Sequence, residues 1–238
     1  MRNLLVLFGV LLLSSCFDIR EEVWVHRDGS GRLALTTTLP DRLIQLSGGE
    51  DGLRTSIHDW FAANPEASLD SLDIAAPADD GTRAVVLHAS AASLQSLAEI
   101  ADRPATDSFL PGIEGFAGDF DVNVSASGIR FEREIGLGKA LGFASMAISP
   151  SERRGHHVEY IIHLPTRTRS NNADEVRDDG QTLLWKRSLG ELLAAPVEMK
   201  FDAPLPIPMT LVLSFAVAIA AALIFAWRIV SRKSKQTT

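Results

Sequence analysis

The only cysteine of the chain, Cys16, ends a short apolar run and directly follows Leu-Ser-Ser. Before it lie a basic start at Arg2, an apolar stretch over residues 4–13 and then small residues, which is the pattern of a secretory signal. Leu-Ser-Ser-Cys matches the lipobox, at which a cysteine thiol receives a lipid such as palmitate. We therefore predict a lipoprotein signal peptide over residues 1–15 and a lipid on Cys16. The alternative is a buried free cysteine beyond an ordinary signal.

A second candidate for chemistry is the alternating set His157, Glu159 and His163. On an extended strand these side chains point to one face, as metal ligands would. His157 and His163 would lie ~20 Å apart along such a strand, which is too far for a single ion. The prediction is therefore a solvated strand face, and no metal site is assigned.

Catalytic motifs are missing from the sequence, which contains no Gly-x-Ser-x-Gly, no Ser-x-x-Lys and no His-Glu-x-x-His. The glycines on either side of Leu137 lack the first glycine and the hydroxyl residue of a phosphate loop. Acidic pairs flank turns, where aspartate commonly accepts backbone hydrogen bonds, at Asp119/Asp121 and Asp178/Asp179. We predict no enzyme, no catalytic residue and no cofactor. An unrecognised hydrolase is the remaining alternative.

Two apolar, glycine-punctuated segments, residues 109–116 and 137–148, are unusual for loops. We expect them to pack into the core as short helices. If they are exposed instead, they would contact the bilayer or line the mouth of an apolar ligand pocket. The residues that would make this contact are Phe109, Leu110, Ile113, Phe116, Leu141, Phe143 and Met146.

Nineteen residues without a charge, 209–227, lie near the C-terminus. As a helix they would cover ~28 Å, close to the ~30 Å hydrocarbon core of a bilayer. A basic tail, residues 228–238, follows them, and the positive-inside rule places such a tail in the cytoplasm. The sequence thus predicts a transmembrane helix in the cytoplasmic (inner) membrane. The N-terminal lipid would insert into the outer leaflet of that membrane, and the main domain would be extracytoplasmic.

The exported domain, residues 16–202, is acidic. Of the 23 basic residues, five lie in the signal and the tail, which leaves 18 against 30 acidic ones. We predict no nucleic-acid partner, because phosphate binding needs clustered positive charge. A single cysteine also excludes an intramolecular disulfide, so the domain must be held together by its own core.

Alternating apolar and polar residues predict consecutive β-hairpins. The expected strand pairs are 19–26 with 33–39, 69–75 with 83–89 and 120–124 with 129–131, followed by strands 156–164, 182–185 and 197–201. One helix is expected after Pro40, another over residues 53–61, and Ser90 would cap a third. The predicted fold class is α+β, an antiparallel sheet of consecutive hairpins with two to three helices packed on it, plus one C-terminal transmembrane helix.

Short connections join this domain to both predicted anchors. Only Phe17 and Asp18 separate Cys16 from the first strand. A proline-rich spacer, residues 203–208, spans roughly 19 Å before the apolar helix. We therefore expect the start of the first strand and the end of the last strand to face the same membrane, where they could be antiparallel neighbours in one sheet.

Together these features resemble the LppM-domain family of bacterial lipoproteins. The resemblance rests on the lipobox, an Asp-Gly-Ser-Gly turn (28–31), a late Leu-Pro (164–165), Asn-Ala-Asp (172–174), the turn Asp-Gly (179–180) and the strand that carries Trp185. Residues 40–154 match nothing in that pattern. The resemblance implies a membrane-tethered extracytoplasmic domain, with lipid or glycolipid recognition suggested for some members, and it gives no catalytic residues.

Two functions follow from these predictions. The first is a non-enzymatic, doubly anchored envelope lipoprotein whose domain binds a lipid, a glycolipid or a protein partner at the membrane surface. The second is an interaction or assembly factor of an envelope protein complex. It would act through a sheet edge or through the transmembrane helix, where alanines over residues 216–222 allow close helix approach.

Overall fold

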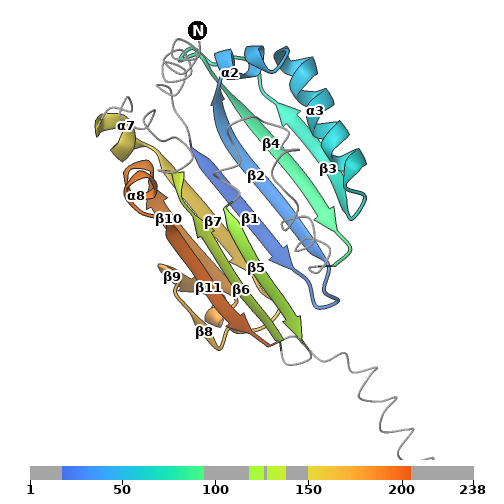
Figure 1. The fold of residues 1–238 in the computed structure, drawn as a ribbon, viewed down its shortest axis with the longest axis vertical. Coiled ribbons are helices and arrows are strands. Elements are labelled where there is room, and N and C mark those ends of the chain that lie inside the picture. Colours follow the sequence, from blue (N-terminus) through green and yellow to red (C-terminus); the bar gives the residue numbers. More distant parts are fainter. Residues whose placement is uncertain (1–17, 94–117, 126–127, 138–149, 205–238) are drawn as a thin grey trace, which may run out of the picture. The chain divides into compact units, whose positions relative to one another are not determined.

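Strands make up most of the chain that the computed structural model describes, which comprises residues 18–93, 118–125, 128–137 and 150–204 (Figure 1). They form a seven-stranded sheet in the order β3-β4-β2-β1-β7-β10-β9 and a four-stranded sheet in the order β5-β6-β11-β8, here named the large and the small sheet. The large sheet contains β1 (Ile19–Val25), β2 (Gly31–Pro40), β3 (Ala67–Ile74), β4 (Thr82–Ala91), β7 (His157–His163), β9 (Glu175–Arg177) and β10 (Thr182–Ser188). The small sheet contains β5 (Asp119–Ser125), β6 (Gly128–Ile135), β8 (Ser170–Asn171) and β11 (Val197–Ala203).

Short helices connect these strands: α2 (Asp41–Leu46), α3 (Gly49–Ala63), α7 (Pro150–Gly155), the 3₁₀ turn η3 (Asp178–Gly180) and α8 (Leu189–Ala194). The helix α3 buries Leu53 and Ile57, two residues of its apolar stripe. A capping box begins α8, in which Ser188 Oγ accepts from Glu191 N and Glu191 Oε2 accepts from Ser188 N.

Two hydrophobic cores lie against the large sheet. The interlayer core joins the apolar face of β1, β7 and β10 to that of β6 and β11, and α8 closes it. Trp185 is its largest fully buried side chain. In the second core, β2, β3 and β4 pack with α2 and α3. Figure 1 shows both helices beside these three strands.

The predicted fold class is wrong in its central feature, because the strands form two sheets and the large sheet is mixed. All three predicted hairpins are present as β1/β2, β3/β4 and β5/β6, and each is antiparallel. However, β1 also pairs in parallel with β7, with Ile19 opposite Val158. A parallel pair requires a long crossover, here more than a hundred residues, which local turn signals do not reveal. The domain is therefore mostly β rather than a hairpin sheet covered by helices.

Further differences concern individual elements. Ser90 does not cap a helix, since it lies inside β4 and its hydroxyl donates to Asp70. The short elements α7, β8, β9 and α8 were not expected from the sequence. Within the described ranges, no helix is long and apolar enough to cross a membrane. The predicted transmembrane segment 209–227, the signal peptide with Cys16, and the basic tail lie outside the described residues.

Candidate functional site

Asp18, the first described residue and the second after Cys16, is fixed by three contacts. Its carboxylate accepts a hydrogen bond from His157 N at 2.8 Å and lies 3.6 Å from His156 Nδ1. Its carbonyl accepts from Thr38 N at 3.1 Å. These contacts hold the start of β1 against the start of β7, beside α7 and α8, where Leu189 N donates to the carbonyl of His156. We name this part of the domain the Asp18 end.

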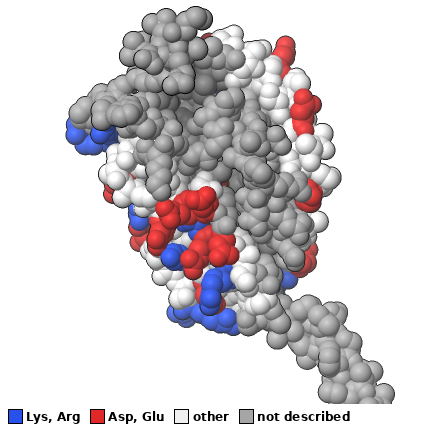
Figure 2. All heavy atoms as spheres, viewed as in Figure 1, with Lys and Arg blue, Asp and Glu red and all other residues white. Residues whose placement is uncertain are grey.

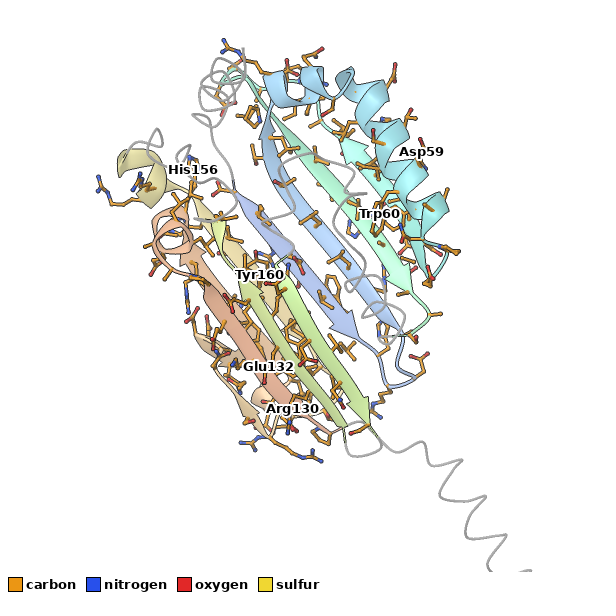
Figure 3. All side chains as sticks on the ribbon, viewed as in Figure 1. Asp59, Trp60, Arg130, Glu132, His156 and Tyr160 are labelled. Carbon is orange, nitrogen blue, oxygen red and sulfur yellow. The ribbon has the colours of Figure 1, made fainter. Side chains whose placement is uncertain are left out.

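The last strand ends on the opposite side of the domain, at what we name the Pro204 end. The carbonyl of Pro204 accepts a hydrogen bond from the Thr166 hydroxyl, and Thr166 follows the end of β7. Since Asp18 contacts the beginning of β7, the two ends are separated by at least the length of that strand, roughly 20 Å. Figure 3 shows the same order, with His156 near one end of the small sheet and Arg130 near the other.

This arrangement corrects the expectation that the first and last strands bring both predicted anchors to one side. The strand β1 has β2 and β7 as neighbours, whereas β11 lies between β6 and β8 in the other sheet. The two strands are therefore not partners. The lengths of the two spacers did not reveal this. They limit how far each end of the domain can lie from its anchor, but they do not say which sheet the first and last strands join.

The predicted contact residues Phe109, Leu110, Ile113, Phe116, Leu141, Phe143 and Met146 lie outside the described residues. These residues belong to the apolar segments 109–116 and 137–148, and the nearest described residues after each segment lie at the Asp18 end. Gly118 precedes β5, whose first residue pairs with Glu134, and Pro150 begins α7. Leu137, which starts the second apolar segment, is fully buried in the interlayer core. Arg154 of α7 is exposed at the same end.

A buried ion pair connects the two sheets in the middle of the domain. Arg133 on β6 donates to both carboxylate oxygens of Glu21 on β1, at 2.7 and 3.1 Å. The Arg133 side chain is 4% exposed and that of Glu21 is 19% exposed. The guanidinium also lies 4.8 Å from the ring centre of Tyr160 on β7, so one cation contacts both neighbouring strands of the large sheet.

Tyr160 completes this cluster, and its hydroxyl is buried. Among the described residues, none is hydrogen-bonded to that hydroxyl. Burial raises the pKa of this phenol well above its ordinary value, so the hydroxyl stays protonated. The observed contact of Tyr160 within this cluster is made by its ring, which packs against the Arg133 guanidinium.

Charged residues cover the outer face of the small sheet, where Figure 2 shows acidic side chains over its middle and basic ones toward the Pro204 end. Cross-strand register places Asp119 opposite Glu134, and Glu134 opposite Glu198. Like charges directly opposite one another are destabilising. Lys200 relieves this repulsion with contacts of 3.1 Å to Glu198 and 3.3 Å to Glu132, which raise the pKa of its ammonium.

A cavity of about 260 Å³ opens at the Pro204 end of this face. Its lining is polar and carries two basic and two acidic side chains, which balance. It is thus not the apolar pocket considered from the sequence. The lining residues are Asp121, Asn123, Ser125, Gly128, Ile129, Arg130, Arg169 and Asp202.

The two histidines of β7 lie at opposite ends of the strand and contact different groups. His157 pairs with Ser188 at one end of the strand, while His163 contacts Glu22 and Thr182 at the other. Among the described residues, no group of three or more His, Cys, Asp or Glu side chains is arranged to hold a metal ion. On this face, His163 of β7 makes hydrogen bonds to side chains of the neighbouring strands β1 and β10.

Sequence reasoning missed the pair Glu21–Arg133, although a signal for it exists. Glu21 stands between Ile19 and Val23, and Arg133 stands between Phe131 and Ile135, at positions where alternation requires an inward side chain. Opposite charges at inward positions of two strands predict that these strands face each other across a core. The chain separation of the pair is 112 residues, so no local rule joins them.

Comparisons with known proteins give a distant structural likeness and no match in sequence. No protein family matches the sequence, and no curated protein matches it. The fold is distantly similar to the folded domain of LppM from Mycobacterium tuberculosis, solved by NMR. The likeness covers 83% of this chain and 94% of that one, with 12% identity and a TM-score of 0.49. At this level it assigns neither a function nor a site to the present chain.

Proposed function

We propose that this protein is a non-enzymatic envelope lipoprotein that is attached to the membrane through a lipid on Cys16. In this proposal the Asp18 end of the domain faces the bilayer and binds a lipid, a glycolipid or a protein partner at its surface. The Pro204 end carries the polar cavity and points away from the bilayer, so in this proposal the lipid on Cys16, and not the predicted helix over residues 209–227, is the membrane anchor.

The observation that carries the proposal is the fixed position of Asp18. A lipid on Cys16 would be only two residues, roughly 7 Å of extended chain, from a residue held at 2.8 Å by the backbone of His157. The lipid would then orient the domain rather than act as a loose tether. A flexible leash would instead leave the carboxylate of Asp18 without partners in the fold.

Two further features at the Asp18 end support this orientation. The exposed Arg154 provides a positive charge, which anionic headgroups attract. Both predicted apolar segments adjoin described residues at this end, namely Gly118 and Pro150. The acidic middle of the small sheet, by contrast, lies farther along the domain, where it would be kept away from such lipids.

The second candidate function is an interaction factor that pairs with a partner strand. It is favoured by the edge strand β9, where Val176 is 47% exposed and is the one large exposed hydrophobic side chain among the described residues. An exposed apolar residue on a sheet edge is suited to strand addition. This candidate requires no particular orientation toward the membrane.

Site-specific photocrosslinking tests the proposed orientation. A benzoylphenylalanine replaces Arg154 in one full-length variant and Arg130 in a matched one, so that each variant loses one exposed arginine. After irradiation in cell membranes, we expect lipid adducts at position 154 and background labelling at position 130, because the two positions lie at opposite ends of the domain.

The outcomes separate the candidates. Equal lipid labelling at both positions, or labelling at position 130 alone, would contradict the orientation. Protein adducts without lipid adducts at either position would favour the interaction factor. Native mass spectrometry of the same protein then shows whether a lipid or glycolipid copurifies with the domain.

A further inference from the structure

A chain of hydrogen bonds connects three strands of the large sheet near the end of β7. Glu22 Oε1 on β1 lies 2.7 Å from His163 Nε2 on β7, and His163 Nδ1 lies 3.0 Å from Thr182 Oγ1 on β10. Thr182 Oγ1 donates to Asp178 Oδ2 in η3 at 2.6 Å. The indole of Trp24 stacks on the imidazole with ring centres 5.1 Å apart. Thr182 is buried, so water does not replace these partners freely.

All three hydrogen bonds of this series can form at once only if the four side chains together hold one proton more than a neutral His163 provides. Burial tends to raise the pKa of Glu22, but hydrogen bonds from His163 and Arg20 outweigh it and lower the pKa, so this carboxylate is ionised and Nε2 must donate to it. The single hydroxyl proton of Thr182 serves either Asp178 or Nδ1. If it serves Asp178, then Nδ1 must also carry a proton. If it serves Nδ1, then Asp178 must be protonated.

The turn at the end of this chain has an unfavourable backbone. Asp178 and Asp179 have φ values of 52° and 53°, and Gly180 follows at 87°. The left-handed region is unfavourable for an L-residue, least so for Asp and Asn. The bond from Thr182 to Asp178 and the bond from Gln181 N to the Asp178 carbonyl hold the turn in this conformation.

The same turn connects the edge strand β9 to β10. The strand β9 has only three residues, and its central Val176 is half-exposed. Little apolar burial therefore holds β9 in place, so its pairing with β10 depends on the contacts at its two ends. One end continues into η3, and at the other Asp174 N donates to the Leu184 carbonyl while the Asp174 carboxylate accepts from Lys186 N. If Asp178 is released, the unfavourable turn can relax and the edge of β10 loses its cover.

Other charged groups around His163 lie on every neighbouring element. Arg20 on β1 contacts Glu22, and Arg177 on β9 is paired with Glu175. Arg167 contacts Asp179 at the turn. Arg32 on β2 lies opposite Trp24, and Glu159 on β7 contacts Lys186. None of these groups is a partner of either imidazole nitrogen, and within the described residues the ring nitrogens are bonded by Glu22 and Thr182.

We propose that the chain Glu22–His163–Thr182–Asp178 is a proton-dependent latch that keeps β9 on the edge of the large sheet. With the extra proton bound, all contacts are made and η3 is held. When the proton leaves at higher pH, either the bond from Thr182 to Asp178 or the bond to His163 is lost. The strand β9 then detaches more often and the backbone of β10 becomes accessible.

Hydrogen exchange of the full-length protein in lipid nanodiscs tests the latch. Protection of residues 174–186 is measured at about pH 5 and about pH 8.5 and corrected for intrinsic exchange. We expect about tenfold lower protection at the higher pH, the effect of losing one hydrogen bond to a charged group. Residues 83–91 of β4 serve as an internal reference and should not respond.

Three variants complete the test. Thr182→Val should give low protection at both pH values, whereas Thr182→Ser keeps the hydroxyl and should retain the pH response. His163→Gln should abolish the response even if Thr182→Val does not fold, and His157→Gln, on the same face of β7, should leave it unchanged. Equal protection of the wild type at both pH values overturns the proposal, as does a pH response that persists in His163→Gln.

Discussion

Replacing Arg133 by methionine is expected to lower the free energy of unfolding by about 3–5 kcal/mol, the range for breaking a buried ion pair. Methionine keeps much of the side-chain volume but leaves the Glu21 carboxylate without its two hydrogen bonds. Glu21 must then remain as an unpaired, largely buried charge or take up a proton. Urea denaturation at neutral pH, followed by circular dichroism, measures the change.

Two further variants identify the cause. The double variant Glu21→Leu/Arg133→Met removes both charges and should recover most of the loss, since an apolar pair of similar volume is often neutral. Tyr160→Phe changes the third member of the cluster and should cost little, because no described residue is hydrogen-bonded to its hydroxyl. A single variant Arg133→Met that is as stable as the wild type would show that the ion pair does not join the sheets.

Replacing Trp185 by alanine is expected to cost a similar 3–5 kcal/mol, through the cavity left in the interlayer core. Trp185 is fully buried, and its indole nitrogen donates to Asn172 Oδ1 at 3.1 Å. Asn172 in turn accepts from Lys200 N on β11, so the indole is connected to the small sheet. Thermal and urea unfolding of the variant provide the measurement.

The matched control is Trp60→Ala, which removes an indole of the same size from α3. Trp60 is only partly buried, so we expect it to cost about 1 kcal/mol or less. Equal losses for the two variants would mean that the interlayer core does not dominate the stability of the domain.

Local patterns predicted much of the secondary structure but not how the strands assemble. Alternation and turn residues identified the hairpins β1/β2, β3/β4 and β5/β6, because both strands of a hairpin lie close in sequence. The parallel pairing of β1 with β7 was missed because its partners lie far apart in sequence. The edge strands β8 and β9 were missed because two or three exposed residues carry no periodic signal.

The candidate site was only partly predictable for a similar reason. The lipobox is a contiguous motif, so Cys16 could be recognised from four letters. The contact of Asp18 with His157 joins residues 139 positions apart. A charged residue at an inward position, such as Glu21, predicts a buried partner of opposite charge. It does not predict which strand carries that partner.

The position of the ends changes how a lipid at Cys16 would act. The sequence suggested that the first and last strands meet at one membrane, whereas the Asp18 and Pro204 ends lie on opposite sides of β7. A lipid near Asp18 would therefore orient a domain whose Pro204 end, with its polar cavity and the basic side chains seen in Figure 2, points away from the attachment point. The Asp18 end, at the membrane, and the Pro204 end, with the polar cavity, are then two separate surfaces of one domain.

Mass spectrometry of the N-terminal peptide tests the central claim most directly. The full-length protein is purified from bacterial membranes, and the mature chain is predicted to begin at Cys16 with a diacylglyceryl or palmitoyl mass on that residue. The Cys16→Ser variant should keep residues 1–15 and carry no lipid. A wild-type chain with an unmodified Cys16 thiol, whether or not the signal is removed, would contradict the account.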